Sequence, residues 1–286
     1  MRYGLVGVLV FLGVVLPTPI LGVQPQRAHA DQRRDWFVAG PREEGTYLSG
    51  DFLLGAVQAT LAHDRRIYGS ANQLTLFGSG MAALPYGTAQ AGFDFRIVAI
   101  SLGASVGVTH AWRGLGCSSD EPCDRDARRE KDASGNYRQP TFAFGELRAQ
   151  LFLPFNRYVT GTAQLTWNVS SAPDRMYDYQ NAVVHDGEML RANFMLFVLN
   201  RAWGAAGPTL QLLNFPLDGQ RRTQTNFGIT ALTRAGLVQR DDLFVVQFLW
   251  HDARITGGYD NRDTYGSHLW RGPFSLLLAY RAQMTL

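Results

Sequence analysis

The sequence is poor in cysteine, in charge and in nucleotide-binding motifs. Only 2 of its 286 residues are cysteine, and 18% are charged. It has no glycine loop followed by Lys-Ser/Thr, no dinucleotide fingerprint opening a helix, and no His-Glu-x-x-His. The phosphate, dinucleotide and zinc chemistry that those motifs support is therefore not indicated, and no cofactor is predicted.

The N-terminus has the features of a secretory leader. Arg2 precedes an apolar run at 4–16, and a polar stretch then ends in Ala28-His29-Ala30. The run is shorter than the ~18 residues of a spanning helix. The pattern predicts a signal peptide over 1–30, with an uncleaved anchor as the alternative. No later segment is long and apolar enough for a membrane helix, so a membrane-embedded chain would have to be a closed barrel.

Charge and cysteine spacing narrow the class further. Two of the 27 basic residues and none of the 24 acidic ones lie in the leader, which leaves a net charge near +1. That balance argues against nucleic-acid binding, which needs a basic stripe. Cys117 and Cys123 lie close together in a polar stretch. In an exported protein this spacing predicts a small disulfide rather than a metal site, and no metal is expected.

Much of the remaining sequence alternates between apolar and polar residues. Between 142 and 154 the odd positions are apolar or small, and the even positions include Glu146, Arg148 and Gln150. After a turn at 154–157 the alternation continues to Val169. Successive strand side chains point to opposite faces, so this hairpin has one apolar and one polar wall.

The whole pattern predicts an all-β, up-and-down antiparallel transmembrane barrel of about ten strands, with twelve as the alternative count. The barrel is expected over 46–286, after a periplasmic lead-in at 31–45. The strands are expected at 46–62, 68–84, 88–112, 141–154, 157–170, 188–202, 207–217, 222–236, 242–252 and 273–286. The third range changes phase between Ile97 and Val98. We interpret the change as a bulge; a tight turn there would instead add a strand.

Connection lengths support an outer-membrane topology. Short connections at 84–88, 155–156, 203–207 and 237–241 alternate with others that include three long polar ones, at 113–140, 171–187 and 253–272. Outer-membrane barrels pair short periplasmic turns with longer external loops and have even strand numbers. Aromatic residues lie mostly near the expected strand ends, as in interface belts or by ordinary strand preference. They are Tyr47, Trp112, Tyr158, Trp167, Trp203, Trp250, Trp270 and Tyr280.

The C-terminus resembles that of bacterial outer-membrane β-barrel proteins. Alternate residues from Phe274 to Leu286 are apolar up to the last position. This is similar to the terminal strand that the barrel-assembly machinery recognises, although Leu286 replaces the usual aromatic residue. The resemblance is one of class and implies an outer-membrane location, with membrane lipid, lipopolysaccharide and the assembly machinery as partners.

In a barrel the polar wall lines the interior, where arginine outnumbers acid and an open lumen would favour anions. Its residues either pair into a packed polar core or line a path for small solutes. The predicted lumen residues are Asp94, Arg96, Glu146, Arg148, Gln150, Thr162, Gln164, Arg191, Asn193, Arg222, Gln224, Arg234, Gln247 and Arg281.

Three functions remain open. The first is a narrow porin-like channel or an envelope-structural barrel with outward-facing loops. The second is a rim hydrolase that resembles omptins in strand count and in rim His and Asp residues, with weak catalytic candidates His185, Asp186, His251 and Asp252. In the ten-strand topology all five histidines of the mature chain, from His63 to His268, lie at the long-loop end. The third is a soluble exported barrel that binds a ligand.

Overall fold

The computed structural model describes ten stretches of the chain, which together contain every strand discussed below. These are 44–53, 55–68, 72–83, 86–112, 141–171, 176–178, 183–200, 204–234, 242–251 and 274–286. The predicted leader, most of the lead-in, and both cysteines of the predicted disulfide lie outside the described residues. No helix in these stretches is long and apolar enough to cross a membrane.

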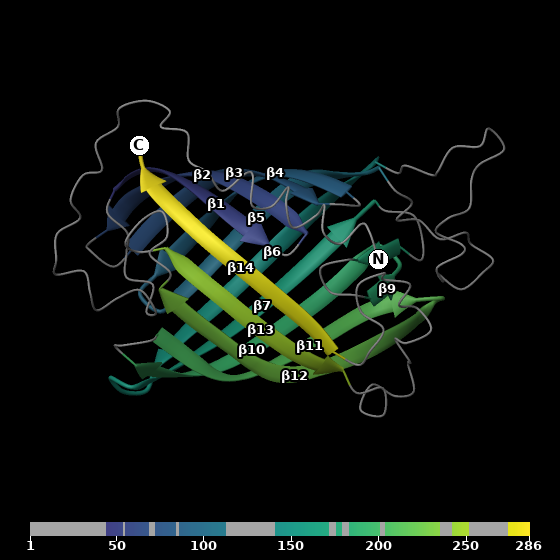
Figure 1. Cartoon of the computed structure of the whole chain (residues 1–286). Coiled ribbons are helices and arrows are strands. Elements are labelled where there is room, and N and C mark those ends of the chain that lie inside the picture. The colour runs from purple at the N-terminus through teal and green to yellow at the C-terminus, as the bar shows by residue number, and fades with distance from the viewer. Residues whose placement is uncertain are drawn as a thin grey trace, which may run out of the picture. The chain divides into compact units, whose positions relative to one another are not determined.

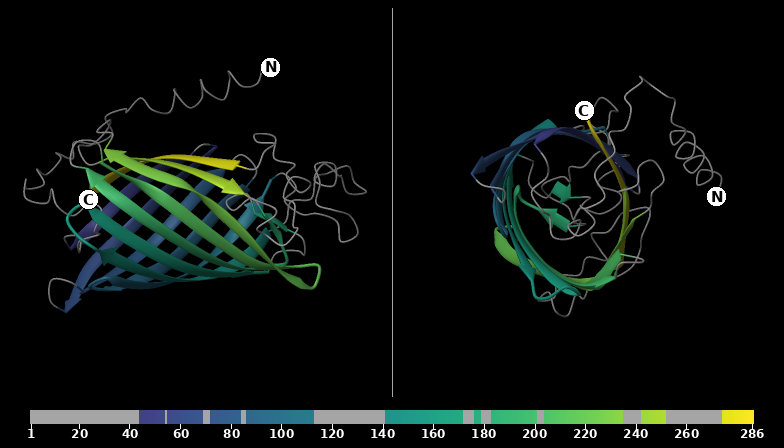
Figure 2. Two further views of the ribbon diagram at one scale, coloured as in Figure 1. Left: turned by 90° about the horizontal axis from the view of Figure 1, so that it is seen from below. Right: turned by 90° about the vertical axis from the view of Figure 1, so that its left-hand side faces the viewer.

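Twelve antiparallel strands form one closed barrel (Figures 1 and 2), and two short strands form a separate hairpin. The barrel strands are β1 (Gly45–Leu53), β2 (Ala56–Tyr68), β3 (Asn72–Ala83), β4 (Tyr86–Ile97), β5 (Ile100–Ala111), β6 (Thr141–Pro154), β7 (Val159–Ser170), β10 (Glu188–Asn200), β11 (Gly204–Leu217), β12 (Gln220–Arg234), β13 (Leu243–His251) and β14 (Phe274–Thr285). The hairpin consists of β8 (Met176–Asp178) and β9 (Val183–His185). The barrel is closed where β1 pairs with β14.

The closed barrel is confirmed, but the preferred count of ten strands is wrong, and twelve is correct. Two predicted strands each contain a hairpin. The range 46–62 is divided between Leu53 and Ala56, and the range 88–112 between Ile97 and Ile100. The interpretation of the phase change at Ile97 as a bulge is therefore wrong, because Val98 lies in a two-residue turn with a φ of 50°. Valine is not a residue that predicts such a turn, which usually carries glycine or asparagine.

Each added hairpin reverses the direction of the strands that follow it, so the two together leave the later strands in the predicted direction. From β5 onward every strand runs as the ten-strand topology expected, and both chain ends of the barrel lie at the same end. We call this end, which carries 98–99 and 155–158, the short-turn end. The other end, the long-loop end, carries the connections 112–140, 171–187 and 252–273. The connection at 84–85 also lies there, so its predicted place among the short periplasmic turns is wrong.

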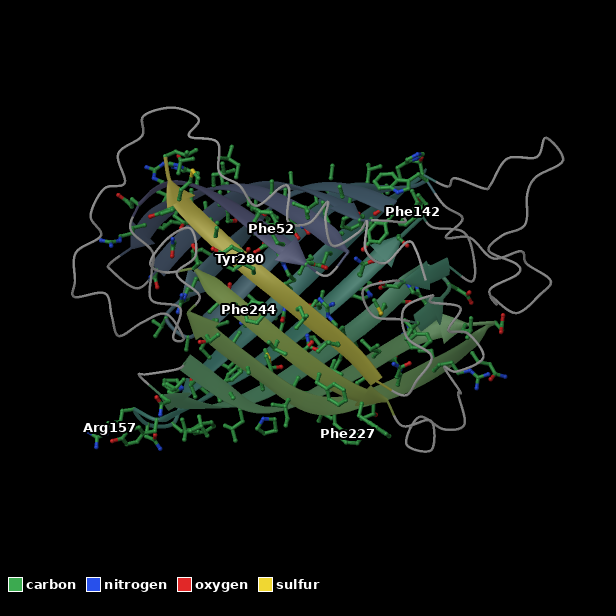
Figure 3. The ribbon with its side chains drawn as sticks, in the orientation of Figure 1. Phe52, Phe142, Arg157, Phe227, Phe244 and Tyr280 are labelled. Carbon is green, nitrogen blue, oxygen red and sulfur yellow. The ribbon has the colours of Figure 1, made fainter. Side chains whose placement is uncertain are left out.

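The outer face of the barrel is apolar along the strands. Leu147 and Leu165 are 51% and 46% exposed, and residues on either side of them in the same strands are less exposed. Figure 3 shows Phe227 projecting away from the barrel wall, and Phe52 beside Tyr280 on the same outer surface. Tyr47 is an exception among the predicted belt aromatics, because it faces inward and is buried.

Candidate functional site: the barrel lumen

A cavity of about 440 Å³ lies inside the barrel and identifies the inner face of its strands. It has a mixed lining, in which apolar side chains alternate around the wall with amides and hydroxyls. The lining residues are Gln150, Phe152, Thr162, Met195, Phe197, Thr230, Leu232, Leu243, Val245 and Gln247. Strand alternation from these positions assigns every other residue of the neighbouring strands to the lumen.

The predicted lumen residues fall on this inner face. Gln150, Thr162 and Gln247 line the cavity directly. Strand alternation and register place the others on the same side of the wall, in β4, β6, β7, β10, β12 and β14. The side chain of Arg234 lies outside the described part of the structure. Their role in lining a solute path is a proposal taken up below.

One group of lumen charges spans three strands. Arg148 Nη2 lies 3.3 Å from Asp94 Oδ2, and Arg148 Nε lies 3.3 Å from Glu146 Oε1. The guanidinium also stacks 5.1 Å from the ring centre of Phe77. β5 runs between Asp94 and Arg148, and its Gly103 faces both of them in register. A charge-assisted network is therefore built across the wall.

Two further acids face the lumen that the sequence interpretation missed. Asp51 accepts hydrogen bonds from Arg281 Nε at 2.5 Å and Arg281 Nη2 at 2.9 Å, across the β1–β14 seam. Asp64 accepts a hydrogen bond from the Thr75 hydroxyl at 2.6 Å. Asp51 lies in the predicted range 46–62, whose division into two strands was not expected, and Asp64 lies in the predicted connection before 68, which is part of β2. With them, lumen charges are closer to balance, and the expected preference for anions is weaker.

The β8–β9 hairpin covers part of the lumen at the long-loop end. Viewed along the barrel axis, the hairpin lies inside the ring of barrel strands (Figure 2, right). The Asp186 amide donates to Pro216 O at 2.9 Å, and Asp186 Oδ2 accepts from the Asp218 amide at 2.8 Å. β9 contacts β11, whose inner residues Leu213 and Phe215 are fully buried. The hairpin is thus attached to the rim of the barrel and packs close to apolar side chains of its wall.

His185 is buried in this hairpin and is 2% exposed. Neither of its ring nitrogens has a hydrogen-bond partner among the described residues. Burial lowers the pKa of His185, although the negative charges of Asp178 and Asp186 partly oppose that effect. The ring is therefore held neutral, since an imidazolium would lose its hydration there without gaining a hydrogen bond.

The remaining histidines do not gather into one site in the described part of the chain. His63 lies toward the short-turn end, where its Nδ1 is 3.1 Å from Thr46 Oγ1, so its predicted long-loop position is wrong. The added hairpin at 54–55 reverses β2 and causes this change. His110 lies near the long-loop end, with Nδ1 2.8 Å from Thr141 Oγ1. His251 ends β13, while Asp252 and His268 lie outside the described residues.

No three His, Cys, Asp or Glu side chains gather as a metal site among the described residues. His110 and Thr141 form a hydrogen-bonded pair, but no carboxylate of the described residues is hydrogen-bonded to either of them. Of the candidates named from the sequence, His185 is buried in the hairpin and the Asp186 carboxylate accepts the amide of Asp218.

No protein-family model and no curated protein matches this chain. Among solved structures, a NanC porin is similar over 85% of this chain and 99% of its own, with 8% identity and a TM-score of 0.35. A KdgM porin is similar over 84% of this chain and 98% of its own, with 7% identity and a TM-score of 0.34. LpxR from Salmonella typhimurium is similar over 84% and 100%, with 6% identity and a TM-score of 0.38. No family is assigned, and the evidence for the barrel is the strand pairing of this chain itself.

Proposed function

We propose that this chain is an outer-membrane β-barrel whose lumen is a narrow porin-like path for small hydrophilic solutes. One observation carries the proposal: a closed wall presents apolar side chains outward and carries charged and polar side chains on its inner face, around a cavity with a mixed lining. An aqueous environment would leave that outer surface exposed at a high free-energy cost of about 25 cal/mol per Å² of apolar area. In hydrocarbon the same surface is solvated, and every strand of the closed barrel has its backbone paired.

The ends of the barrel support an orientation. Both chain ends of the barrel lie at the short-turn end, and the three long connections lie at the other. A chain that enters the membrane from the periplasm would leave the short-turn end there. The long-loop end would then meet lipopolysaccharide and the exterior, with the β8–β9 hairpin as a partial cover of the outer mouth. The terminal β14 would be the strand offered to the assembly machinery.

Membrane location is tested first by extraction. The protein should leave cell envelopes only in detergent, and its folded form should migrate differently from the boiled form in gel electrophoresis. Release from the envelope by high salt or by osmotic shock alone would instead support a soluble exported barrel.

Channel activity is tested by recording ion current across a planar bilayer that contains the purified protein. We expect small, discrete current steps. Thr162 lines the cavity, so Thr162→Trp should reduce the step size, whereas the same change at the next residue, Ala163→Trp on the outer face, should not. If the wild type gives no current steps at any voltage, or if both variants conduct like the wild type, the lumen is not the path.

A further inference from the structure

One row of the inner wall carries a side-chain amide in each of five neighbouring strands. The backbone register pairs Gln150 with Gln164, then Gln164 with Asn193, across β6, β7 and β10. It continues from Asn193 to Gln211 and from Gln211 to Asn226, across β11 and β12. We call these five residues the amide row. Side chains in register on one face lie close enough to interact, so the row forms a continuous polar strip around the lumen.

The β11–β12 half of the row is satisfied internally. The Asn226 amide donates to Gln211 Oε1 at 2.6 Å. The amide of Gln224, two residues along β12, donates to Asn226 Oδ1 at 2.9 Å. Gln224 and Asn226 are both fully buried. This half is therefore structural.

The β6–β10 half is different, because it borders the cavity: Gln164 and Asn193 each lie two residues from a lining residue, Thr162 and Met195. Gln150 lines the 440 Å³ cavity. No described residue forms a hydrogen bond with the side-chain amide of Gln150 or Gln164. The Asn193 Oδ1 atom is buried and accepts no hydrogen bond from the described residues. A buried acceptor left without a partner is unfavourable, because it has lost its hydration without gaining a hydrogen bond. Asn193 Oδ1 is therefore suited to a ligand that supplies the missing partner, and the half-buried amides of Gln164 and Gln150 beside it in register are also free of hydrogen bonds from the described residues.

The surroundings of these amides indicate the chemistry of that ligand. Phe152, Met195 and Phe197 line the same cavity and give it an apolar wall. Each amide both donates and accepts hydrogen bonds, which matches the hydroxyl group. Among the cations near this cavity, Arg148 is paired with Asp94 and Glu146, and Arg96 donates to Val98 O and lies 5.2 Å from the ring centre of Phe152. A pocket of this size with an apolar wall and a few polar groups is typical of small-molecule sites. A sugar presents hydroxyls at its edge and C–H groups on its ring faces, and so matches both surfaces.

We propose that Gln150, Gln164 and Asn193 form a lumen subsite for neutral, polyhydroxylated solutes of the sugar class. The subsite rests on the proposed function, in which such a solute would enter the lumen. The amides hold the hydroxyl groups, and the apolar wall of Met195 and Phe197 accommodates the ring faces.

The test is equilibrium dialysis of radiolabelled maltotriose against the purified full chain in detergent micelles. Wild type should bind maltotriose and should not bind a poly(ethylene glycol) of the same mass, which has ether oxygens but no ring hydroxyls. Gln164→Met and Asn193→Leu keep the side-chain size but remove the amide. Each should weaken binding about 3- to 10-fold, the loss of roughly one hydrogen bond. Gln58→Met removes a lumen amide that donates to Thr60 outside the row, so it should bind like the wild type.

Dialysis does not depend on ion conduction, so the two proposals can fail separately. If the bilayer recordings show current steps but maltotriose does not bind, or binds Gln164→Met and Asn193→Leu as well as the wild type, the subsite is wrong and the channel stands. If maltotriose binds and both variants weaken it while no current is seen, the subsite stands and the channel is wrong. Equal weakening by Gln58→Met would also overturn the subsite, because binding would then not be specific to the row.

Discussion

At the residue scale, the lumen network depends on one position without a side chain. Gly103 stands between Asp94 and Arg148 on the inner face of β5. A Cβ atom built there would lie 2.0 Å from Asp94 Oδ1 and 3.0 Å from the carbonyl oxygen of Phe93. The Asp94 carboxylate therefore reaches toward Arg148 through the space that glycine leaves free.

Gly103→Ala should displace the Asp94 carboxylate and break its contact with Arg148. We expect a loss of about 1–3 kcal/mol in the free energy of unfolding, since a partly buried guanidinium loses a charged partner. The measurement is urea unfolding of the protein in lipid vesicles, followed by tryptophan fluorescence. Gly145→Ala is the matched control, because a Cβ there meets nothing within 4 Å. If both variants unfold at the same urea concentration as the wild type, the network does not contribute to stability.

Val98 is the second position where one residue decides a local structure. Its φ of 50° is costly for a β-branched residue. Val98→Gly should therefore stabilise the β4–β5 hairpin by about 1 kcal/mol. Ala99→Gly, in the same turn but at negative φ, should instead lower stability by about 0.5–1 kcal/mol. The same urea unfolding assay compares them, and a less stable Val98→Gly variant would show that the turn is not strained.

At the element scale, the β8–β9 hairpin combines a rim attachment with a buried neutral histidine. An undocked hairpin would expose His185, which would then take up a proton at its ordinary pKa. In the docked hairpin His185 resists protonation, because burial lowers the pKa of its ring. The contribution of neutral His185 to the docking free energy is therefore fully present above the ordinary histidine pKa. It is lost progressively as the pH falls below that pKa.

We expect the hairpin to open more readily below about pH 6.5. The probe is hydrogen exchange of the Asp186 amide, which donates to Pro216 in the docked state. Its protection, corrected for intrinsic exchange, should fall as the pH decreases, while the Leu199 amide, bonded to Tyr158 O in the barrel, should stay protected. His185→Leu should remove the pH dependence. A variant that keeps the full pH dependence would mean that another group controls docking.

At the scale of the whole molecule, the decisive property is the contrast between the two faces of one wall. Leu165 lies on the outer face of β7, and its neighbour Gln164 lies on the inner face. In the proposed membrane setting, a new side chain at Leu165 would contact hydrocarbon. The same side chain at Gln164 would lie in the lumen.

Leu165→Arg and Leu147→Arg should prevent insertion into lipid vesicles, because an arginine on the lipid face costs about 2–4 kcal/mol near the bilayer midplane. Gln164→Arg should insert normally. The measurement is the fraction of protein that gains heat-modifiable gel mobility after dilution from urea into vesicles. Normal insertion of both leucine variants would show that the apolar face does not contact lipid.

The period of two in the sequence determined the closed barrel and the two faces of its wall, because strand geometry fixes which residues share a face. The hairpin at 155–158 and the long connections at 113–140 and 171–187 were also predictable, since turns and polar loops have compositions of their own. The Asp218-Gly219 turn, with both residues at positive φ, follows the usual hairpin rule and lies between the predicted strands 207–217 and 222–236.

The strand count and the partners across the lumen were decided only by the tertiary structure. Val98 and Ala99 carry no turn signal, so the β4–β5 hairpin forms because strand pairing on both sides compensates for the strained residue. Closure of β1 against β14 joins Asp51 to Arg281, 230 positions apart. The amide row likewise joins residues of five strands through register alone. Such contacts depend on strand order and register, which local side-chain periodicity does not encode.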